Sequence, residues 1–168
     1  FYSNFIPLDE VSLDKILNYS YLRSVHISIY GHDEESFIRF TKSNKVSYNK
    51  LVQNLTLLEK KLSEKPILFD LALGHRTENK FLLSKSNSDL SMIIKKLIKN
   101  HNISYNYLYA FNNWGGMIKD SDISDLNIQF KKTPIKKVGA CGLVFSKLIV
   151  GANGTINACA CRDANYSL

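Results

Sequence analysis

Cysteine is absent from the first 140 residues of this 168-residue chain, and Cys141, Cys159 and Cys161 all lie near its end. Three thiols cannot all pair with one another, and a reducing compartment would keep them as thiols, so no disulfide framework is expected. A lone cysteine is usually a small buried side chain. Three of them within 21 residues favour a metal or iron–sulfur site instead.

The sequence also lacks long hydrophobic runs. No stretch approaches the roughly 18 consecutive apolar residues that a membrane span requires, and the N-terminus has no charged-then-apolar signal peptide pattern. We therefore expect a cytoplasmic protein without a membrane partner. Because the chain opens on Phe1 without an initiator methionine and stops shortly after its last cysteine, we also interpret it as a segment of a longer protein.

Concentrated basic clusters are missing as well. The net charge is +7, but it comes mostly from lysines that are spread along the chain. A nucleic-acid-binding protein typically gathers arginine and lysine on one element, with aromatic residues between them. Here the lysine pairs fall on the polar faces of expected helices, which is typical of solvated surface, so no nucleic-acid partner is expected. The pairs begin at Lys60, Lys95, Lys131 and Lys136.

Helical and strand periodicities alternate through the first 111 residues. With 45% hydrophobic residues, the chain can bury one core, so a single domain with an appendage is expected. Asp9 or Ser12 is available as N-cap of the first helix, and Ser88 as N-cap of the last. The alternation predicts right-handed βαβ crossovers and a parallel sheet. The expected elements are helix 11–19, strand 24–30, helix 47–63, strand 67–73, a helix after residue 88, and strand 103–111.

Strand 24–30 favours a partial (β/α) TIM-type barrel over a doubly wound sheet. One of its faces is wholly aliphatic, which suits helix packing, and the other carries His26, Ser28 and Tyr30, which suit a polar ligand. In either α/β fold, functional groups gather at the carboxyl ends of the strands. By that rule the candidate functional residues are Ser28 and Tyr30, the turn at residues 74–76, and the two asparagines at 112–113. Arg76 could pair with a carboxylate at the barrel mouth, but it is interpreted as a residue on the surface of a loop.

The end of the chain predicts a small cysteine-bearing β-hairpin. Asn153-Gly154 is a strong signal for a two-residue turn, and both flanking segments are strand-like. A turn centred there would place Cys159 opposite Leu148. Cys159 and Cys161 would share one strand face, because side chains repeat every two residues. The domain organisation expected is a barrel portion at 1–111, a linker at 112–140 and a cysteine-bearing unit at 141–168.

The spacing of Cys141, Gly154 and Cys159 resembles the opening motif of the SPASM domain. That domain is the C-terminal extension of many radical S-adenosylmethionine enzymes, and it binds auxiliary 4Fe-4S clusters. Other segments resemble the same superfamily in matching order, so the resemblance covers nearly the whole chain. These segments are Tyr2-Ser3-Asn4, the strand from His26 to Gly31 with the acidic residues at 33–35, the helix around Asn54, and the loop at 113–116.

The resemblance implies an enzyme that cleaves S-adenosylmethionine reductively and abstracts hydrogen from a peptide, protein or sugar substrate. It implies that Ser28 and, more weakly, Asn4 hold S-adenosylmethionine. Cys141 and Cys159 would ligate an auxiliary 4Fe-4S cluster, and flavodoxin or ferredoxin would supply electrons. The motif does not require Cys161, which is either a further ligand, a substitute for one of the others, or not a ligand. The defining C-x-x-x-C-x-x-C loop of the superfamily is absent from this sequence. The segment by itself is therefore expected to be inactive.

Two other classes remain open from the residues alone. One is a zinc-holding binding module without catalytic activity, since zinc also prefers thiolate ligands. The other is an ordinary βα-barrel enzyme in which the cysteines are buried structural side chains. The metal content of the purified protein distinguishes all three.

Overall fold

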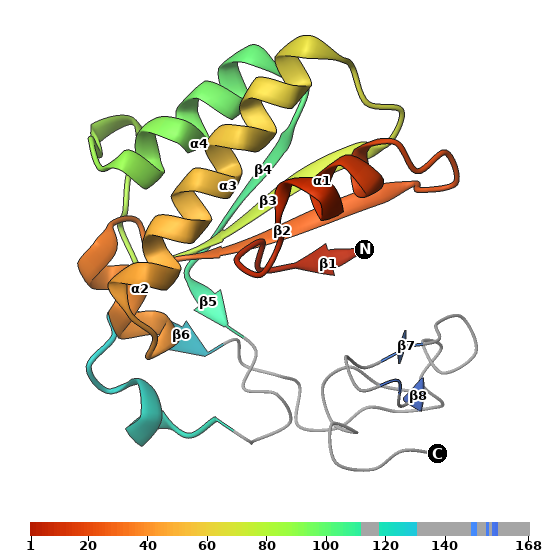
Figure 1. Ribbon diagram of the computed structural model, residues 1–168. Coiled ribbons are helices and arrows are strands. Elements are labelled where there is room, and N and C mark those ends of the chain that lie inside the picture. The colour runs from red at the N-terminus through yellow and green to blue at the C-terminus, as the bar shows by residue number, and fades with distance from the viewer. Residues whose placement is uncertain (112–117, 131–148, 151–153, 155, 158–168) are drawn as a thin grey trace. The chain divides into compact units, whose positions relative to one another are not determined.

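The computed structural model describes residues 1–111, 118–130, 149–150, 154 and 156–157 (Figure 1). The chain forms two compact units. The first comprises Phe1–Tyr109 with Leu126–Ile128, and the second comprises Ala110–Asp125 with Gln129–Leu168. None of the helices within the described ranges is long and apolar enough to cross a membrane.

The first unit is a mixed α/β structure built on a four-stranded parallel sheet, which confirms the predicted alternation and the parallel sheet. Its strands lie in the order in which they occur in the sequence. Helix α1 connects the first two strands, α2 and α3 connect the second to the third, and α4 precedes the fourth. The elements are β1 (Tyr2–Ser3), α1 (Glu10–Leu17), β2 (Ser24–Tyr30), α2 (Glu34–Thr41), α3 (Lys45–Glu64), β3 (Asp70–Arg76), the 3₁₀ helix η1 (Leu83–Lys85), α4 (Asp89–Asn100) and β4 (Ser104–Leu108).

Each α-helix begins at a residue whose side chain accepts a hydrogen bond from the first turn. The predicted caps Asp9 of α1 and Ser88 of α4 accept from the backbone N–H groups of Ser12 and Ser91. Asp33 and Asn44 cap α2 and α3 in the same way. Such caps satisfy one of the four N–H groups that a helix start leaves without an intrahelical partner. Local sequence therefore determines where each helix begins.

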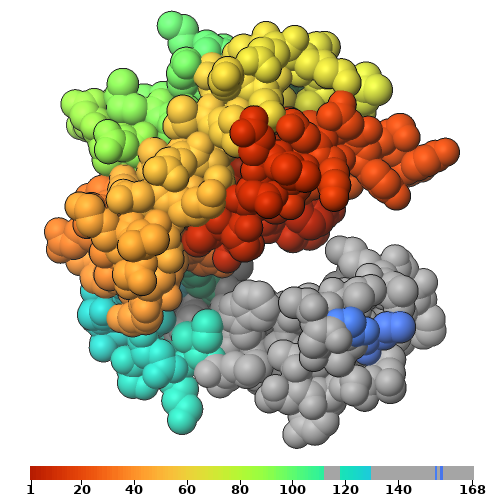
Figure 2. All heavy atoms as spheres, viewed as in Figure 1, coloured from red at the N-terminus to blue at the C-terminus, as the bar shows by residue number. Residues whose placement is uncertain are grey.

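Helices α1, α3 and α4 pack on one face of the sheet (Figure 1). Val25, Ile27 and Ile29 of β2 are at most 2% exposed, and they pack with Leu71 and Leu73 of β3 and with apolar side chains of the helices. Figure 2 gives the same view with all atoms and shows the helix layer covering the sheet. The aliphatic face of β2 is the core face, as predicted.

Asn54 of α3 fixes the loop that follows β1. This buried side chain donates from Nδ2 to the carbonyl oxygens of Phe5, Ile6 and Leu8, at 2.7, 3.2 and 2.9 Å. Phe5 has a φ of 65°, which is uncommon for a residue with a side chain, and its ring is buried. A buried carbonyl without a partner is costly, so Asn54 stabilises a loop that the backbone alone would not favour.

The third strand lies three residues later than predicted. The apolar run at 67–73 was expected to form the strand and to stop at Gly74, whereas β3 runs from Asp70 to Arg76. Ile67 and Phe69 pack on the core only partly, before the strand begins, and Leu68 is 93% exposed. His75 instead continues the buried face of the strand. Pairing with β2 through Tyr30 and Arg76 carries the strand past the glycine.

The predicted strand 103–111 is divided between the two units. β4 ends at Leu108, and β5 (Ala110–Phe111) pairs in parallel with β6 (Gln129–Phe130) in the second unit, which also holds the 3₁₀ helix η3 (Asp120–Ile123).

Near the end of the chain, β7 (Ile149–Val150) pairs antiparallel with β8 (Ile156–Asn157). Val150 lies opposite Ile156, whereas a two-residue turn at 153–154 would place it opposite Asn157. The predicted register is therefore wrong by one residue, although Gly154 has the positive φ (80°) expected of a turn.

Candidate functional site

The side chains of β2, β3 and β4 that point away from the core form what we call the polar face. The parallel register pairs Ser28 with Gly74 and Tyr30 with Arg76, and it pairs Gly74 with Asn106 on the other side. These positions lie toward the carboxyl ends of the strands, where parallel α/β folds place their ligands. The polar face consists of His26, Ser28, Tyr30, Ala72, Gly74, Arg76, Ser104, Asn106 and Leu108.

Ser28 and Arg76 contact each other across two strands. Arg76 donates from Nη1 to Oγ of Ser28 at 3.0 Å, and its guanidinium carbon lies 5.5 Å from the centre of the Tyr30 ring. Gly74 lies next to this pair, and a Cβ there would be in ordinary contact with Nη1 of Arg76, at 3.4 Å. The interpretation of Arg76 as a loop residue was wrong. It is a strand residue whose guanidinium lies beside Ser28, the residue predicted to bind the cofactor.

An aromatic stack lies earlier on the same face. The rings of Tyr2 and His26 are nearly parallel, with centroids 4.6 Å apart and an interplanar angle of 13°. His26 is two residues before Ser28, which corresponds to roughly 7 Å along a strand. The polar face therefore offers a hydroxyl, a guanidinium and a flat aromatic surface within the length of a small organic ligand.

Asn4 lies just beyond the paired part of β1. The pairing of β1 with β2 ends at Ser3 and Ile27, one residue before Asn4 and Ser28. The exposed Asn4 side chain accepts a hydrogen bond from the backbone N–H of Ile6 at 3.3 Å. Asn4 therefore lies at the carboxyl end of β1. Its amide oxygen already accepts the hydrogen bond from Ile6 within the local turn.

His75 forms a buried network on the core side of the same strand ends. Its Nε2 lies 2.7 Å from the carbonyl oxygen of Gly31, so Nε2 carries the proton, and Nδ1 accepts from the hydroxyl of Tyr105 at 2.8 Å. Burial lowers the pKa of His75 to about 4 and raises the pKa of Tyr105 to about 12. Both groups are therefore neutral near pH 7 and act as fixed hydrogen-bonding groups.

Sequence reasoning did not identify a role for His75. The signal was present, because residues 71, 73 and 75 have the parity of a single strand face. Because the strand was expected to end at Gly74, the pattern was not extended to His75.

His32 lies two residues after the end of β2 and hydrogen-bonds beside this polar network. Its Nδ1 lies 2.9 Å from Oγ1 of the buried Thr77, and its ring stacks on Phe81 with centroids 4.6 Å apart. Beside it is a cavity of about 740 Å³ lined by side chains of both charges, including Asp33, Glu78, Lys80 and Lys85. Glu78 is paired with Arg39, and Asp33 caps α2. The acidic groups at this rim therefore already have structural partners.

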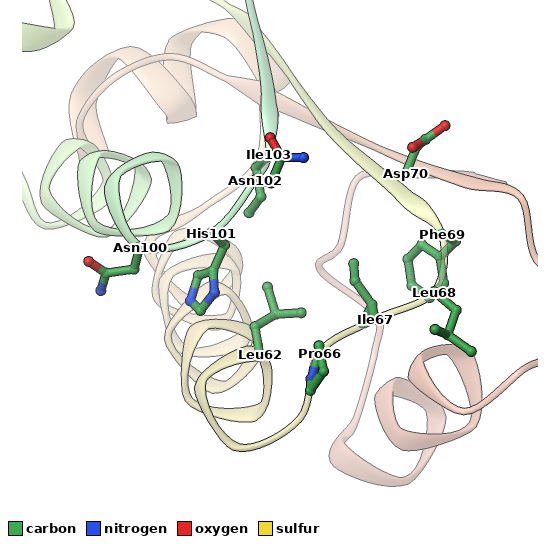
Figure 3. Close-up of a pocket in the computed structure, with 10 residues that line it drawn as sticks. All are labelled: Leu62, Pro66, Ile67, Leu68, Phe69, Asp70, Asn100, His101, Asn102 and Ile103. Carbon is green, nitrogen blue, oxygen red and sulfur yellow. The ribbon is translucent and has the colours of Figure 1, made fainter.

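A second cavity, of about 480 Å³, lies at the opposite ends of the strands (Figure 3). It is lined by Leu62, residues 66–70 and residues 100–103, which precede β3 and β4. Next to it, the buried carboxylate of Glu59 accepts hydrogen bonds from Lys96 and Asn100, which joins α3 to α4 and lowers the pKa of Glu59. Parallel α/β folds place their ligands at the carboxyl ends of the strands, so we assign this cavity no ligand.

The predicted cluster ligands Cys141, Cys159 and Cys161 lie outside the described residues. Within the described part of the chain, no group of three or more histidine, cysteine, aspartate or glutamate side chains is arranged to hold a metal ion. The paired segments β7 and β8 are the described residues nearest to these cysteines in the sequence.

The chain was compared with models of protein families, with curated proteins and with solved structures. No model of a protein family, no curated protein and no solved structure matches this chain.

Proposed function

We propose that this chain is part of a radical S-adenosylmethionine enzyme, consisting of the later portion of a partial TIM-type barrel and the start of a SPASM domain. The first unit supports the barrel assignment. Its strands follow one another in sequence order, and α1, α3 and α4 pack on one face of the sheet, so the other face is left for a ligand.

The observation that carries the proposal is the position of Ser28. It lies on the polar face near the carboxyl end of β2, and its hydroxyl accepts a hydrogen bond from Arg76, which leaves the hydroxyl proton to donate to a ligand oxygen. This donor matches the hydroxyl and carboxylate oxygens of S-adenosylmethionine. Asn4, at the end of β1, is the second residue proposed for this cofactor.

The bound cofactors would supply the radical chemistry, and the protein would orient them and keep water away from the reacting atoms. Cys141 and Cys159, with Cys161 as a further ligand, would hold an auxiliary 4Fe-4S cluster through their thiolates. The substrate proposed is a peptide, protein or sugar, and a flavodoxin or ferredoxin would donate electrons. The C-x-x-x-C-x-x-C loop is not in this sequence, so the 168-residue chain alone should show no turnover.

Anaerobic reconstitution with iron and sulfide tests the proposal. We expect a brown protein that binds about four iron atoms per chain, as a single 4Fe-4S cluster requires. Cys141→Ala and Cys159→Ala should each abolish iron binding, and Cys161→Ala should reduce it. Ser20→Ala, at an exposed position far from the cysteines in sequence, is the matched control and should bind iron as the natural chain does.

The alternatives give different results in the same experiment. A zinc module would be colourless and contain stoichiometric zinc, and an ordinary barrel with structural cysteines would contain neither metal. Either result would contradict the proposed function.

A further inference from the structure

Arg76 carries the only full charge in the carboxyl halves of β2, β3 and β4 on the polar face. Apart from the ionisable His26, the described positions around it are neutral: Ser28, Tyr30, Ala72, Gly74, Ser104, Asn106 and Leu108. Asp70, a carboxylate at the start of the same strand, is six residues away, which corresponds to roughly 20 Å. The guanidinium is thus an isolated positive charge on a half-buried surface.

The guanidinium is also held in place. Ser28 accepts a hydrogen bond from Nη1 of Arg76 at 3.0 Å, and the guanidinium carbon lies 5.5 Å from the centre of the Tyr30 ring. One Nη1 hydrogen is used by Ser28, and the remaining N–H groups of the guanidinium have no other acceptor among the described residues. A guanidinium with a fixed plane loses little entropy when it binds a planar two-oxygen acceptor.

No carboxylate among the described residues forms an ion pair with Arg76. By comparison, the guanidinium of Arg39, in the last turn of α2, is paired with the carboxylate of Glu78. A half-buried guanidinium without an anion is costly unless a ligand supplies one.

We infer that Arg76 is the recognition residue for a ligand carboxylate, and that Ser28 and Tyr30 position its guanidinium. A carboxylate fits better than a phosphate, because a single cation balances one negative charge and a phosphate dianion would call for more. The carboxylate has two possible sources, the amino-acid end of S-adenosylmethionine or an acidic side chain of a peptide. The inference needs only the polar face, so it does not depend on the proposed iron–sulfur chemistry.

The test is a titration of the ¹⁵N-labelled 168-residue chain, followed at the Nε–Hε resonance of Arg76 and, in variants that lack this group, at the backbone amide of Gly74. The probes are S-adenosylmethionine, the peptide acetyl-Gly-Glu-Gly-amide and its glutamine counterpart. We expect one of the two carboxylate probes to saturate the resonance, which identifies the source, and the glutamine peptide to leave it unchanged. Arg76→Gln should weaken that binding roughly 10- to 100-fold, because a charge-assisted bidentate contact is lost.

Two further variants separate recognition from folding. Arg76→Lys keeps the charge but loses the planar fork, so its affinity should fall between those of the natural chain and Arg76→Gln. Arg23→Gln removes the same charge from an exposed position before β2 and should bind as the natural chain does. Thermal unfolding confirms that each variant is folded. The inference is overturned if neither carboxylate saturates, if the glutamine peptide binds equally well, or if folded Arg76→Gln retains full affinity.

Discussion

Replacing Gly31 by alanine should destabilise the chain by roughly 3–5 kcal/mol, which is exceptional for a single methyl group. Gly31 ends β2 with a φ of 70°, a conformation that costs a residue with a side chain roughly 1–2 kcal/mol. The first turn of α2 adds a larger penalty. A Cβ at this position would lie 2.4 Å from the backbone nitrogen of Phe37 and 2.7 Å from the carbonyl carbon of Ser36.

The effect should be large because backbone atoms cannot move aside as the end of a side chain can. Both backbone polar groups of Gly31 are also hydrogen-bonded. Its N–H donates to the carbonyl oxygen of Arg76, and its carbonyl oxygen accepts from Nε2 of His75. Gly74→Ala is the matched control. Its nearest neighbour is the flexible end of Arg76 at 3.4 Å, so a change below about 1 kcal/mol is expected. Urea unfolding measures both, and equal effects would contradict this description of the β2–α2 junction.

Stability should also fall by roughly 3 kcal/mol as the pH decreases from about 6.5 to about 4, because of His75 alone. Its pKa in the folded chain is about 4, lowered from 6.5 mainly by burial. Below pH 6.5 the unfolded chain takes up a proton that the folded chain does not accept until about pH 4. The unfolded state binds more protons in this window, so the contribution is complete above pH 6.5 and is lost as the pH falls.

The free energy of unfolding, measured between about pH 7 and pH 4.5, checks this prediction against His75→Gln. Glutamine can still donate to the carbonyl oxygen of Gly31 but does not titrate. The variant should be less stable at neutral pH, and its stability should depend less steeply on pH. Parallel pH profiles for the two proteins would show that the His75 imidazole is not kept neutral by its surroundings.

Local signals predicted most of the first unit. The alternation of Val25, Ile27 and Ile29 with polar residues predicted β2 with its observed bounds, since alternation is a property of a single strand. The caps Asp9 and Ser88 were also predicted, because a cap depends on residues within one turn of the helix.

The errors arose where pairing with a distant segment decides the structure. Gly74 is a local stop signal, but the pairing of Tyr30 with Arg76 extends β3 beyond it. Likewise, the register of β7 and β8 depends on the number of residues in their connection, and Asn153-Gly154 alone did not determine that number. Tertiary pairing outweighed local propensity at both places.

The candidate site was predicted in part for the same reason. Ser28 was selected because alternation and strand polarity place it on the polar face near the carboxyl end of β2, and the structure has it at that position. The partner Arg76 was misplaced because its strand was ended too early. Its contact with Ser28 joins residues 48 positions apart, so no local pattern could predict it.

The most direct test of this description is to map where S-adenosylmethionine binds on the ¹⁵N-labelled chain. We predict that backbone amide shifts change at Ser28, Tyr30, Gly74 and Arg76, which share the polar face at the carboxyl ends of β2 and β3. No change at these residues at about 10 mM ligand, or changes confined to the amino-end cavity of Figure 3, would contradict the assignment of the polar face as the functional site.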